Sequence, residues 1–201
     1  MSKREVRSFP VGDVEFRVED REDGSSELVS LAPPWGTLSV DLGGFREQFQ
    51  HGALDLSGDV VATVEHSTSS LLGRTGSGTL ALRNTDKGLE YRVELPDTTA
   101  GRDLRELVKR GDIFGSSFEF RVKAGGEEWT EDEAGAVTRT VTDAELFQVG
   151  PVTRPAYPEG AEIALRSHEQ ASTEEAERLK READEDTARR RRLELAELDT
   201  A

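Results

Sequence analysis

The sequence contains no cysteine among its 201 residues. This absence excludes disulfide bonds, thiolate catalysis and the usual structural zinc sites. Only three histidines are present, too few to form a histidine-rich metal cluster. We therefore expect neither a metal ion nor any other cofactor.

Long apolar runs are missing as well. No run of about 18 apolar residues occurs, so we expect no membrane-spanning helix and no membrane partner. The first ten residues, MSKREVRSFP, lack the apolar stretch of a secretory signal. These two absences predict a protein that works in the cytoplasm where it is made.

Cations are scarce relative to anions. Lysine and arginine total 26 residues against 41 aspartates and glutamates, which gives a formal net charge of −15. Nucleic-acid binding needs clustered cations that displace counterions from phosphates, so we exclude nucleic acid as a partner. The negative charge is typical of a chain that resists self-association or docks on a basic partner.

The composition of the chain changes near residue 166. Glycine, proline and β-branched residues punctuate the part before it, whereas residues 167–201 contain no glycine, proline or aromatic residue. The alanine, glutamate, leucine and arginine of this last segment favour helix. We predict a folded domain over residues 1–166 and a charged helical or disordered tail over residues 167–201.

Short apolar runs with alternating polarity dominate the predicted domain, as is typical of strands. A turn-like segment, NTDKG, indicates a hairpin, and an apolar stripe that ends at Gly111 predicts a helix over residues 101–112. A second helix is predicted over residues 45–53. We expect a mainly β (α+β) fold, a small antiparallel β-barrel of about seven strands decorated with helices. The predicted strands are residues 14–20, 54–66, 78–84, 88–96, 116–124, 136–150 and the stretch after Pro158.

Two motifs suggest ligand sites but lack the required residues. The segment GRTGSGT (73–79) is rich in glycine, but it lacks the lysine and hydroxyl ending of a phosphate-binding loop. The segment EDEAGAV (131–137) lacks the ligand spacing of a calcium loop. We interpret the first as a flexible loop between strands and the second as a turn.

Two serines stand at the start of the strand within GDIFGSSFEF (111–120). Strand alternation places Ser116 with the phenylalanines that face the core. It places Ser117 on the polar face, where a substrate could reach it. Ser117 is therefore the candidate nucleophile, and a plain strand-start serine is the alternative.

His66 is the candidate base for such a serine. It closes the run VVATVEH, in which Val60, Ala62, Val64 and His66 alternate onto one side, and the polar residues STSS follow it. A serine hydroxyl becomes a strong nucleophile when a neighbouring imidazole takes its proton. No G-x-S-x-G motif occurs, which excludes the α/β-hydrolase version of this chemistry. An ordinary strand-end histidine is the alternative.

The order of four segments resembles the prohead (capsid maturation) serine protease family of tailed bacteriophages. That family is similar in fold to the herpesvirus assembly proteases. The segments cover residues 41–160 almost without a gap. They read DLGGFREQFQHGALD (41–55), EHSTSSLLGRTGSGTLAL (65–82), KGLEYRVELPDTTAGRDLRELVKRGDIFGSSFEFRV (87–122) and AELFQVGPVTRPAYPEG (144–160).

The resemblance implies that Ser117, just before the aromatic residue of the SF-x-F strand, is the nucleophile and that His66 is the base. The family commonly has an acid and a serine before its VT-x-PA segment, where this chain has Gln148 and Gly150. Gln148 in this third catalytic position would orient the imidazole by a hydrogen bond without supplying charge.

A nearby acid is the alternative in the third position, and Glu145, Asp143 and Glu65 are the candidates. The resemblance assigns no family site to His51 or His168. Backbone N–H groups must bind the oxyanion, and the candidate loop is residues 150–160. The segments 73–79 and 125–135 are expected to border the site.

The function implied by the resemblance is that of a serine endopeptidase in prohead maturation. Its expected substrates are the scaffold-like part of the major capsid protein and the protease itself, cleaved in the host cytoplasm inside the assembling prohead. The tail would anchor the protease and then be removed, and homo-oligomer formation is left open. The alternative is a catalytically weak or inactive capsid assembly or scaffolding module on the same fold.

Overall fold

The computed structural model describes residues 3–10, 16–153, 178, 180 and 181. The chain divides into two units, residues 1–161 and 162–201. The described residues of the second unit, Arg178, Lys180 and Arg181, are helical and exposed. Within the described residues, no helix is both long and apolar enough to cross a membrane.

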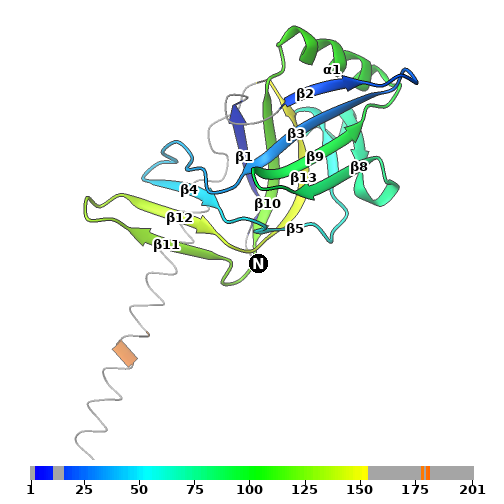
Figure 1. Ribbon diagram of the computed structural model, residues 1–201. Helices are drawn as coiled ribbons and strands as arrows, with labels where there is room; N and C mark the ends of the chain where they lie inside the picture. The colour runs from blue at the N-terminus through cyan, green and yellow to red at the C-terminus, as the bar shows by residue number, and fades with distance from the viewer. Residues whose placement is uncertain (1–2, 11–15, 154–177, 179, 182–201) are drawn as a thin grey trace, which may run out of the picture. The chain divides into compact units, whose positions relative to one another are not determined.

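The largest of three sheets contains Ser117, on β10, and one of its other strands, β6, ends three residues before His66 (Figure 1). Its strands follow the order β1-β10-β13-β6-β7, and a short sixth strand, β5, also pairs with β13. These strands are β1 (Glu5–Pro10), β5 (Leu54–Asp55), β6 (Val61–Thr63), β7 (Leu71–Arg74), β10 (Gly115–Val122) and β13 (Ala144–Val152).

Two smaller sheets complete the described part of the first unit. One has the order β2-β3-β9-β8 and the other the order β11-β12-β4. Their strands are β2 (Phe16–Asp20), β3 (Ser26–Pro34), β8 (Leu80–Asn84), β9 (Gly88–Glu94), β4 (Phe45–Phe49), β11 (Glu127–Glu131) and β12 (Val137–Val141).

The fold is mainly β with one α-helix in the described part of the first unit, as predicted, but the prediction of about seven antiparallel strands is wrong. Thirteen strands are described, and β13 pairs in parallel with β5 and β6, as β12 does with β4. Alternating polarity is the same in parallel and antiparallel strands, so the pattern could not reveal strand direction. The described ladders form no closed barrel, and barrel closure stays a prediction.

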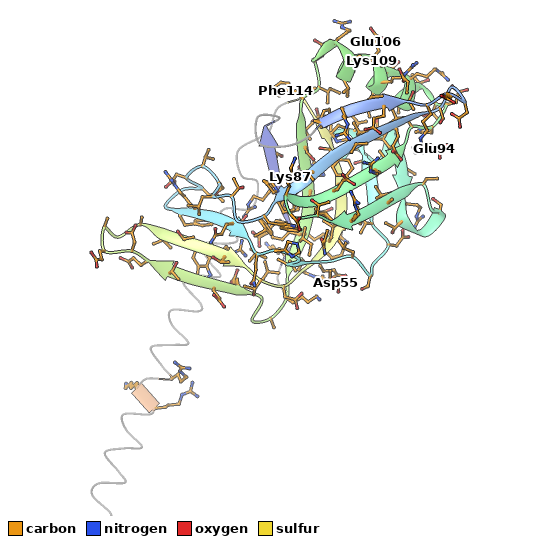
Figure 2. The ribbon with its side chains drawn as sticks, in the orientation of Figure 1. Asp55, Lys87, Glu94, Glu106, Lys109 and Phe114 are labelled. Atoms are coloured by element: carbon orange, nitrogen blue, oxygen red, sulfur yellow. The ribbon has the colours of Figure 1, made fainter. Side chains whose placement is uncertain are left out.

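The hairpin and the first helix are confirmed. Strands β8 and β9 pair as an antiparallel hairpin around the NTDKG turn. Helix α1 (Thr99–Arg110) begins with the Thr98 side chain accepting a hydrogen bond from Gly101 N and ends at Gly111, whose φ is 78°. Arg105 and Lys109 of α1 donate to the Asp20 carboxylate on β2, which joins the helix to its sheet. Lys109 is labelled in Figure 2.

The prediction of a second helix over residues 45–53 is wrong, because Phe45–Phe49 form strand β4. Phe45, Glu47 and Phe49 are buried on alternate positions, whereas Arg46 is exposed. A buried glutamate hides this alternation from a reading that counts only apolar residues.

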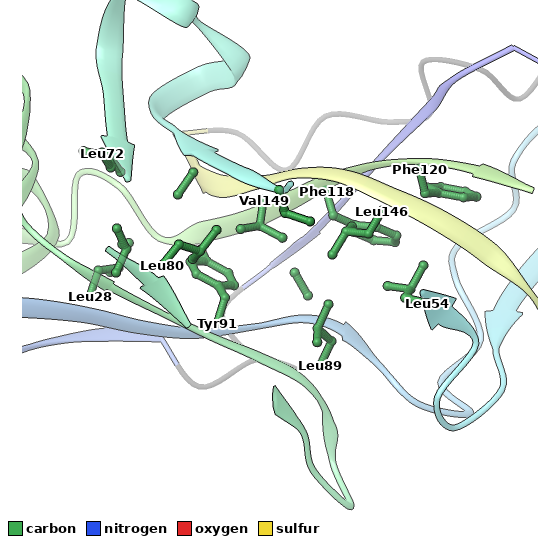
Figure 3. Close-up of a cluster of buried hydrophobic side chains, with 14 of the residues drawn as sticks. Leu28, Leu54, Leu72, Leu80, Leu89, Tyr91, Phe118, Phe120, Leu146 and Val149 are labelled. Carbon is green, nitrogen blue, oxygen red and sulfur yellow. The ribbon is translucent and has the colours of Figure 1, made fainter. Parts of the chain in front are cut away.

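A hydrophobic core fills the space between the largest sheet and the β2-β3-β9-β8 sheet (Figure 3). The rings of Phe118 and Phe120 on β10 each meet the Phe49 ring edge-on, with centroids 5.1 Å apart. Tyr91 and Val149 are fully buried in the same cluster. Strand β10 is therefore fixed by its core-facing side chains, which sets the position of the residues on its other face.

A buried ionic cluster ties β1 to the smallest sheet. Arg7 donates to Glu47 at 2.7 Å and to Glu5 at 2.8 Å. Arg139 donates to Glu47 and to Glu127, both at 2.6 Å. Burial alone would lower the pKa of Arg139, but its hydrogen bond to Glu5 and the charges of Glu47, Glu5 and Glu127 raise it above the usual value. We call Glu5, Arg7, Glu47, Glu127 and Arg139 the ionic cluster.

Candidate active site

The two serines at the start of β10 point to opposite faces of the strand. Ser116 is fully buried, and its hydroxyl donates to the Tyr91 hydroxyl at 3.2 Å inside the core. The prediction that Ser116 faces the core is confirmed. Ser117 consequently lies on the other face of the sheet.

Ser117 is also fully buried, so the prediction that a substrate could reach it directly is wrong for this structure. In the sheet it lies between Ser8 of β1 and Gly150 of β13. The Ser8 hydroxyl donates to Ser117 Oγ at 3.0 Å, and the Arg7 carbonyl oxygen lies 2.9 Å from Ser117 Oγ. The prediction went wrong because β1 was not recognised as a strand beside β10.

The backbone bends sharply at Glu65 and His66, just after β6. Strand β6 ends at Thr63, and Glu65 and His66 adopt positive φ values of 51° and 55°. Such conformations cost about 1–3 kcal/mol each in residues other than glycine and cluster at functional sites. The prediction of alternation through His66 is therefore wrong, since the strand stops three residues earlier.

This bend brings the His66 ring within hydrogen-bond distance of Ser117. His66 Nε2 lies 2.6 Å from Ser117 Oγ, and His66 Nδ1 lies 3.0 Å from Gln148 Oε1. In the tautomer with the proton on Nδ1, the ring donates to the Gln148 carbonyl oxygen and its free Nε2 accepts the serine proton. This is the geometry by which an imidazole activates a serine hydroxyl.

Gln148 is itself held by a residue that the sequence did not indicate. Its Nε2 donates to Thr63 Oγ1 at the end of β6. Gly150, two residues along β13, has no side chain at a point where a Cβ would lie 1.9 Å from the Thr63 carbonyl oxygen. Gly150 therefore permits a close approach of β6 and β13. We call Ser8, Thr63, His66, Ser117 and Gln148 the serine–histidine cluster.

The carboxylates considered for the third catalytic position each bind a group other than His66. Glu145 accepts from Arg121, Asp143 pairs with Lys123 at 2.9 Å, and the Glu65 carboxylate accepts from Thr153 N. Within the described residues, no carboxylate lies within hydrogen-bond distance of the His66 ring.

Other predicted features have other contacts or lie outside the described residues. The His51 ring packs near Trp35, with centroids 5.8 Å apart. Residues 73–79 form the end of β7 and a short 3-10 turn, bound to Asp59, that leads into β8, so the predicted connection between strands is confirmed. Residues 132–135 form the turn that was predicted. His168, residues 154–160 of the oxyanion-loop candidate and the strand after Pro158 lie outside the described residues.

No group of three or more histidine, aspartate or glutamate residues in the described ranges could hold a metal ion. The groups that meet at the serine–histidine cluster are a hydroxyl, an imidazole and an amide. These groups together suit nucleophilic attack by the serine, with the histidine moving the proton.

The sequence matches the caudovirus prohead serine protease family over residues 13–175. The chain therefore belongs to this family: it is a serine peptidase and a capsid maturation protease. The resemblance seen in the sequence is confirmed. Comparison with curated proteins gives no significant match. A solved structure, that of the capsid assembly protease of bacteriophage T4, is similar with a TM-score of 0.44 and 10% identity, covering 74% of this chain and 98% of that chain.

Proposed function

We propose that Ser117 is the nucleophile, His66 the general base and Gln148 the third catalytic residue of this protease. The observation that carries the proposal is the 2.6 Å separation of Ser117 Oγ and His66 Nε2. Ser117 on β10 and His66 in the bend after β6 meet at hydrogen-bond distance, and Glu65 and His66 adopt left-handed backbone angles at this bend. A plain strand-end histidine and a plain strand-start serine have no need of that arrangement.

The reaction follows from these positions. His66 Nε2 takes the Ser117 proton while Oγ attacks a peptide carbonyl carbon to give a tetrahedral intermediate. The imidazolium then gives its proton to the leaving amine, and an acyl-enzyme forms. Water attacks the acyl-enzyme with His66 again as base, which releases the acid product and restores the hydroxyl.

Gln148 orients the ring throughout this sequence, because its Oε1 accepts a hydrogen bond from His66 Nδ1–H. It supplies a dipole and no formal charge, so the imidazolium is less stabilised than beside a carboxylate. Because Ser117 is fully buried, a substrate reaches its hydroxyl only after the surrounding structure changes. The resting arrangement is therefore one of low activity.

The substrates we propose are the scaffold-like part of the major capsid protein and the protease itself, including its tail over residues 167–201. The cleavage would take place inside the assembling prohead in the host cytoplasm. An inactive assembly module is the second candidate, and the complete burial of Ser117 favours it.

Co-expression of the chain with its capsid protein tests these alternatives. We compare the unmodified chain with Ser117→Ala and with the matched control Ser116→Ala, and follow both proteins by intact mass. The proposal predicts trimming of the capsid protein that disappears in Ser117→Ala and persists in Ser116→Ala. Full-length capsid protein in every case would favour the assembly module, and trimming by Ser117→Ala would overturn the assignment of the nucleophile.

The same spectra test the processing of the tail. The proposal predicts loss of a C-terminal segment, with a cut between residues 160 and 201, in the unmodified chain and not in Ser117→Ala. A protease of unchanged mass beside a trimmed capsid protein would overturn this part.

A further inference from the structure

The bend after β6 contains two adjacent residues with left-handed backbone angles. The φ values of Glu65 and His66 are 51° and 55°. Asparagine, aspartate and histidine adopt this conformation more readily than other residues with a side chain, and glutamate is not among them. Such a backbone persists only where the surrounding contacts fix it. Glu65 therefore needs a contact that holds it in the bend.

The contacts of the His66 ring change during the proposed reaction. The ring is bound through Nε2 to Ser117 and through Nδ1 to Gln148. The first of these bonds changes when the proton passes from the serine to the ring. A constant hold on the bend has to come from a group that takes no part in the proton transfer.

Glu65 makes a contact of this kind. Its carboxylate accepts a hydrogen bond from the backbone N–H of Thr153. Thr153 directly follows β13, the strand that carries Gln148. Hydrogen bonds between a carboxylate and a backbone N–H are stronger than those between neutral groups. The bend is thus tied to the same strand that orients the His66 ring.

Backbone pairing does not supply this tie. Strands β6 and β13 are parallel, and their described register ends with Val149 opposite Ala62. Strand β6 stops at Thr63, before the bend, so the ladder does not continue to Thr153. A backbone N–H needs an acceptor, and the Glu65 carboxylate provides one for Thr153. The side chain takes the place of a ladder bond that the bend interrupts.

Building on the proposed function, we propose that Glu65 is a positioning residue of the proteolytic site. By binding Thr153 N, it holds the bend in the shape that keeps His66 Nε2 within hydrogen-bond distance of Ser117 Oγ. Glu65 is exposed, so it fills no space in the core. Its role is to set the position of the histidine backbone, whereas Gln148 sets the orientation of the histidine ring.

Two amides of different length test this role. Glu65→Gln keeps the length of the side chain and a carbonyl oxygen that accepts from Thr153 N. Glu65→Asn carries the same amide one carbon–carbon bond, about 1.5 Å, closer to the backbone. Asparagine also adopts positive φ more readily than glutamine. The second variant therefore loses the contact while it suits the backbone of the bend better.

Labelling of Ser117 by diisopropyl fluorophosphate measures activation of the serine without a peptide substrate. In this reaction Oγ bonds to phosphorus, fluoride leaves, and His66 takes the hydroxyl proton. We expect labelling to slow by about tenfold or more in Glu65→Asn, because a small displacement of a catalytic base is costly. We expect Glu65→Gln to stay within about threefold of the unmodified chain, because the acceptor remains. Trimming of the capsid protein should follow the same order.

Two results of the labelling experiment would count against the proposal. Labelling of Glu65→Asn at the unmodified rate would overturn it, because the bend would then need no contact with Thr153. Equal losses in both variants would also overturn it, since they would assign the effect to the charge of Glu65 and not to the acceptor. If Glu65→Asn does not fold, Glu65→Asp takes its place, because aspartate is equally short and also tolerates positive φ.

The His66 ring gives a readout that does not depend on chemistry at the serine. A ring N–H held in a hydrogen bond exchanges slowly with water, so it gives a proton signal in the NMR spectrum of chain with ¹⁵N-labelled histidine. The chain has three histidines, and His66→Ala identifies the signal of His66. We expect this signal in the unmodified chain and in Glu65→Gln, and its loss in Glu65→Asn. A signal that persists in Glu65→Asn would contradict the displacement of the ring.

Failure of the proposed function gives a different pattern. Capsid protein that is still trimmed by Ser117→Ala would show that this cluster is not the proteolytic site. The NMR comparison of Glu65→Asn with Glu65→Gln then decides whether Glu65 positions His66. Trimming that depends on Ser117, together with an unchanged labelling rate and an unchanged His66 signal in Glu65→Asn, would overturn the role of Glu65 and leave the proposed function intact.

Discussion

Two buried polar clusters lie on opposite faces of the β1–β10 strand pair, and they differ in charge. Arg7, which lies opposite Phe118, belongs to the ionic cluster, and Ser8, which lies opposite Ser117, belongs to the serine–histidine cluster. The ionic cluster contains three carboxylates and two guanidinium groups in direct contact. The serine–histidine cluster contains no side chain with a permanent charge.

The difference follows from what each cluster has to do. A buried charge is tolerated when a partner and hydrogen bonds compensate it, and such a pair fixes the strands that carry it. The ionic cluster thus holds β1 in place. The serine–histidine cluster has to pass a proton between groups, so its hydrogen bonds must be able to change direction. Neutral groups that both donate and accept allow this.

The largest effect is expected from breaking the ionic cluster. Arg139→Met leaves three carboxylates without this guanidinium, and we expect the free energy of unfolding to fall by about 3–5 kcal/mol. Urea denaturation measures the loss. The matched control is Arg121→Met, which breaks a partly exposed pair with Glu145 and should cost about 0–1 kcal/mol. Equal losses would mean that burial does not distinguish the two arginines.

A smaller effect, on the pH dependence of stability, is expected from Tyr91, the buried partner of Ser116. Burial raises the pKa of Tyr91 to about 12. The unfolded chain ionises near the ordinary value of 10.0, so stability is fully present below that pH and falls as the pH rises toward 12. We expect a loss on the order of 1 kcal/mol from this group one pH unit above its ordinary pKa.

Tyr91→Phe isolates that contribution. Denaturation curves at neutral and alkaline pH should show that the stability difference between the two chains shifts in favour of Tyr91→Phe above pH 10. A difference that is independent of pH would contradict the buried, neutral phenol.

Gln148→Glu places a charged group in the serine–histidine cluster and tests whether the lack of charge in this cluster matters for catalysis. A carboxylate on His66 Nδ1 stabilises the imidazolium in the transition state, and we expect trimming to speed up by as much as about tenfold. It also favours the imidazolium at rest, so the acidic limb of the pH–rate profile should move up by about one pH unit.

Gln48→Glu is the matched control for this added charge. Gln48 lies on β4 and donates to Thr140, away from the His66 ring. The same charge at this position should leave the acidic limb where it is. A limb that moves equally in both variants would mean that the neutrality of the serine–histidine cluster has no bearing on catalysis.

The smallest effect is expected from Ser8, where β1 touches the nucleophile. Ser8→Ala removes the donor to Ser117 Oγ, and we expect trimming to slow by about threefold while stability changes by about 1 kcal/mol or less. Ser25→Ala, in the turn between β2 and β3, removes a hydroxyl that donates to Asp23 and serves as the control, which should leave the rate unchanged. Loss of folding in Ser8→Ala would mean that the contact is chiefly structural.

Local patterns were sufficient to predict some elements of the fold. The apolar stripe and the glycine stop predicted helix α1, and the NTDKG turn between alternating runs predicted the β8–β9 hairpin. The opposite orientations of Ser116 and Ser117 followed from the period of a strand alone. These features depend on residues close together in the chain.

The features that the sequence did not reveal depend on partners far away in the chain. Strand β4 contains a glutamate whose burial is made possible by Arg7 and Arg139, so its alternation could not be recognised locally. The burial of Ser117 depends on β1, more than a hundred residues earlier in the sequence. Glu65 and His66 carry left-handed backbone angles that no residue preference indicates. The contact between Thr63 and Gln148 joins residues far apart in the chain, so the sequence did not indicate it.

The central claim is that His66 activates Ser117, and labelling of the serine tests it most directly. The full-length chain is treated with diisopropyl fluorophosphate under conditions in which capsid protein is trimmed, and the adduct is located by peptide mass spectrometry. The account predicts an adduct on Ser117 that persists in Ser116→Ala and is lost in His66→Ala. An adduct on Ser116, or an adduct on Ser117 that forms equally well without His66, would contradict it.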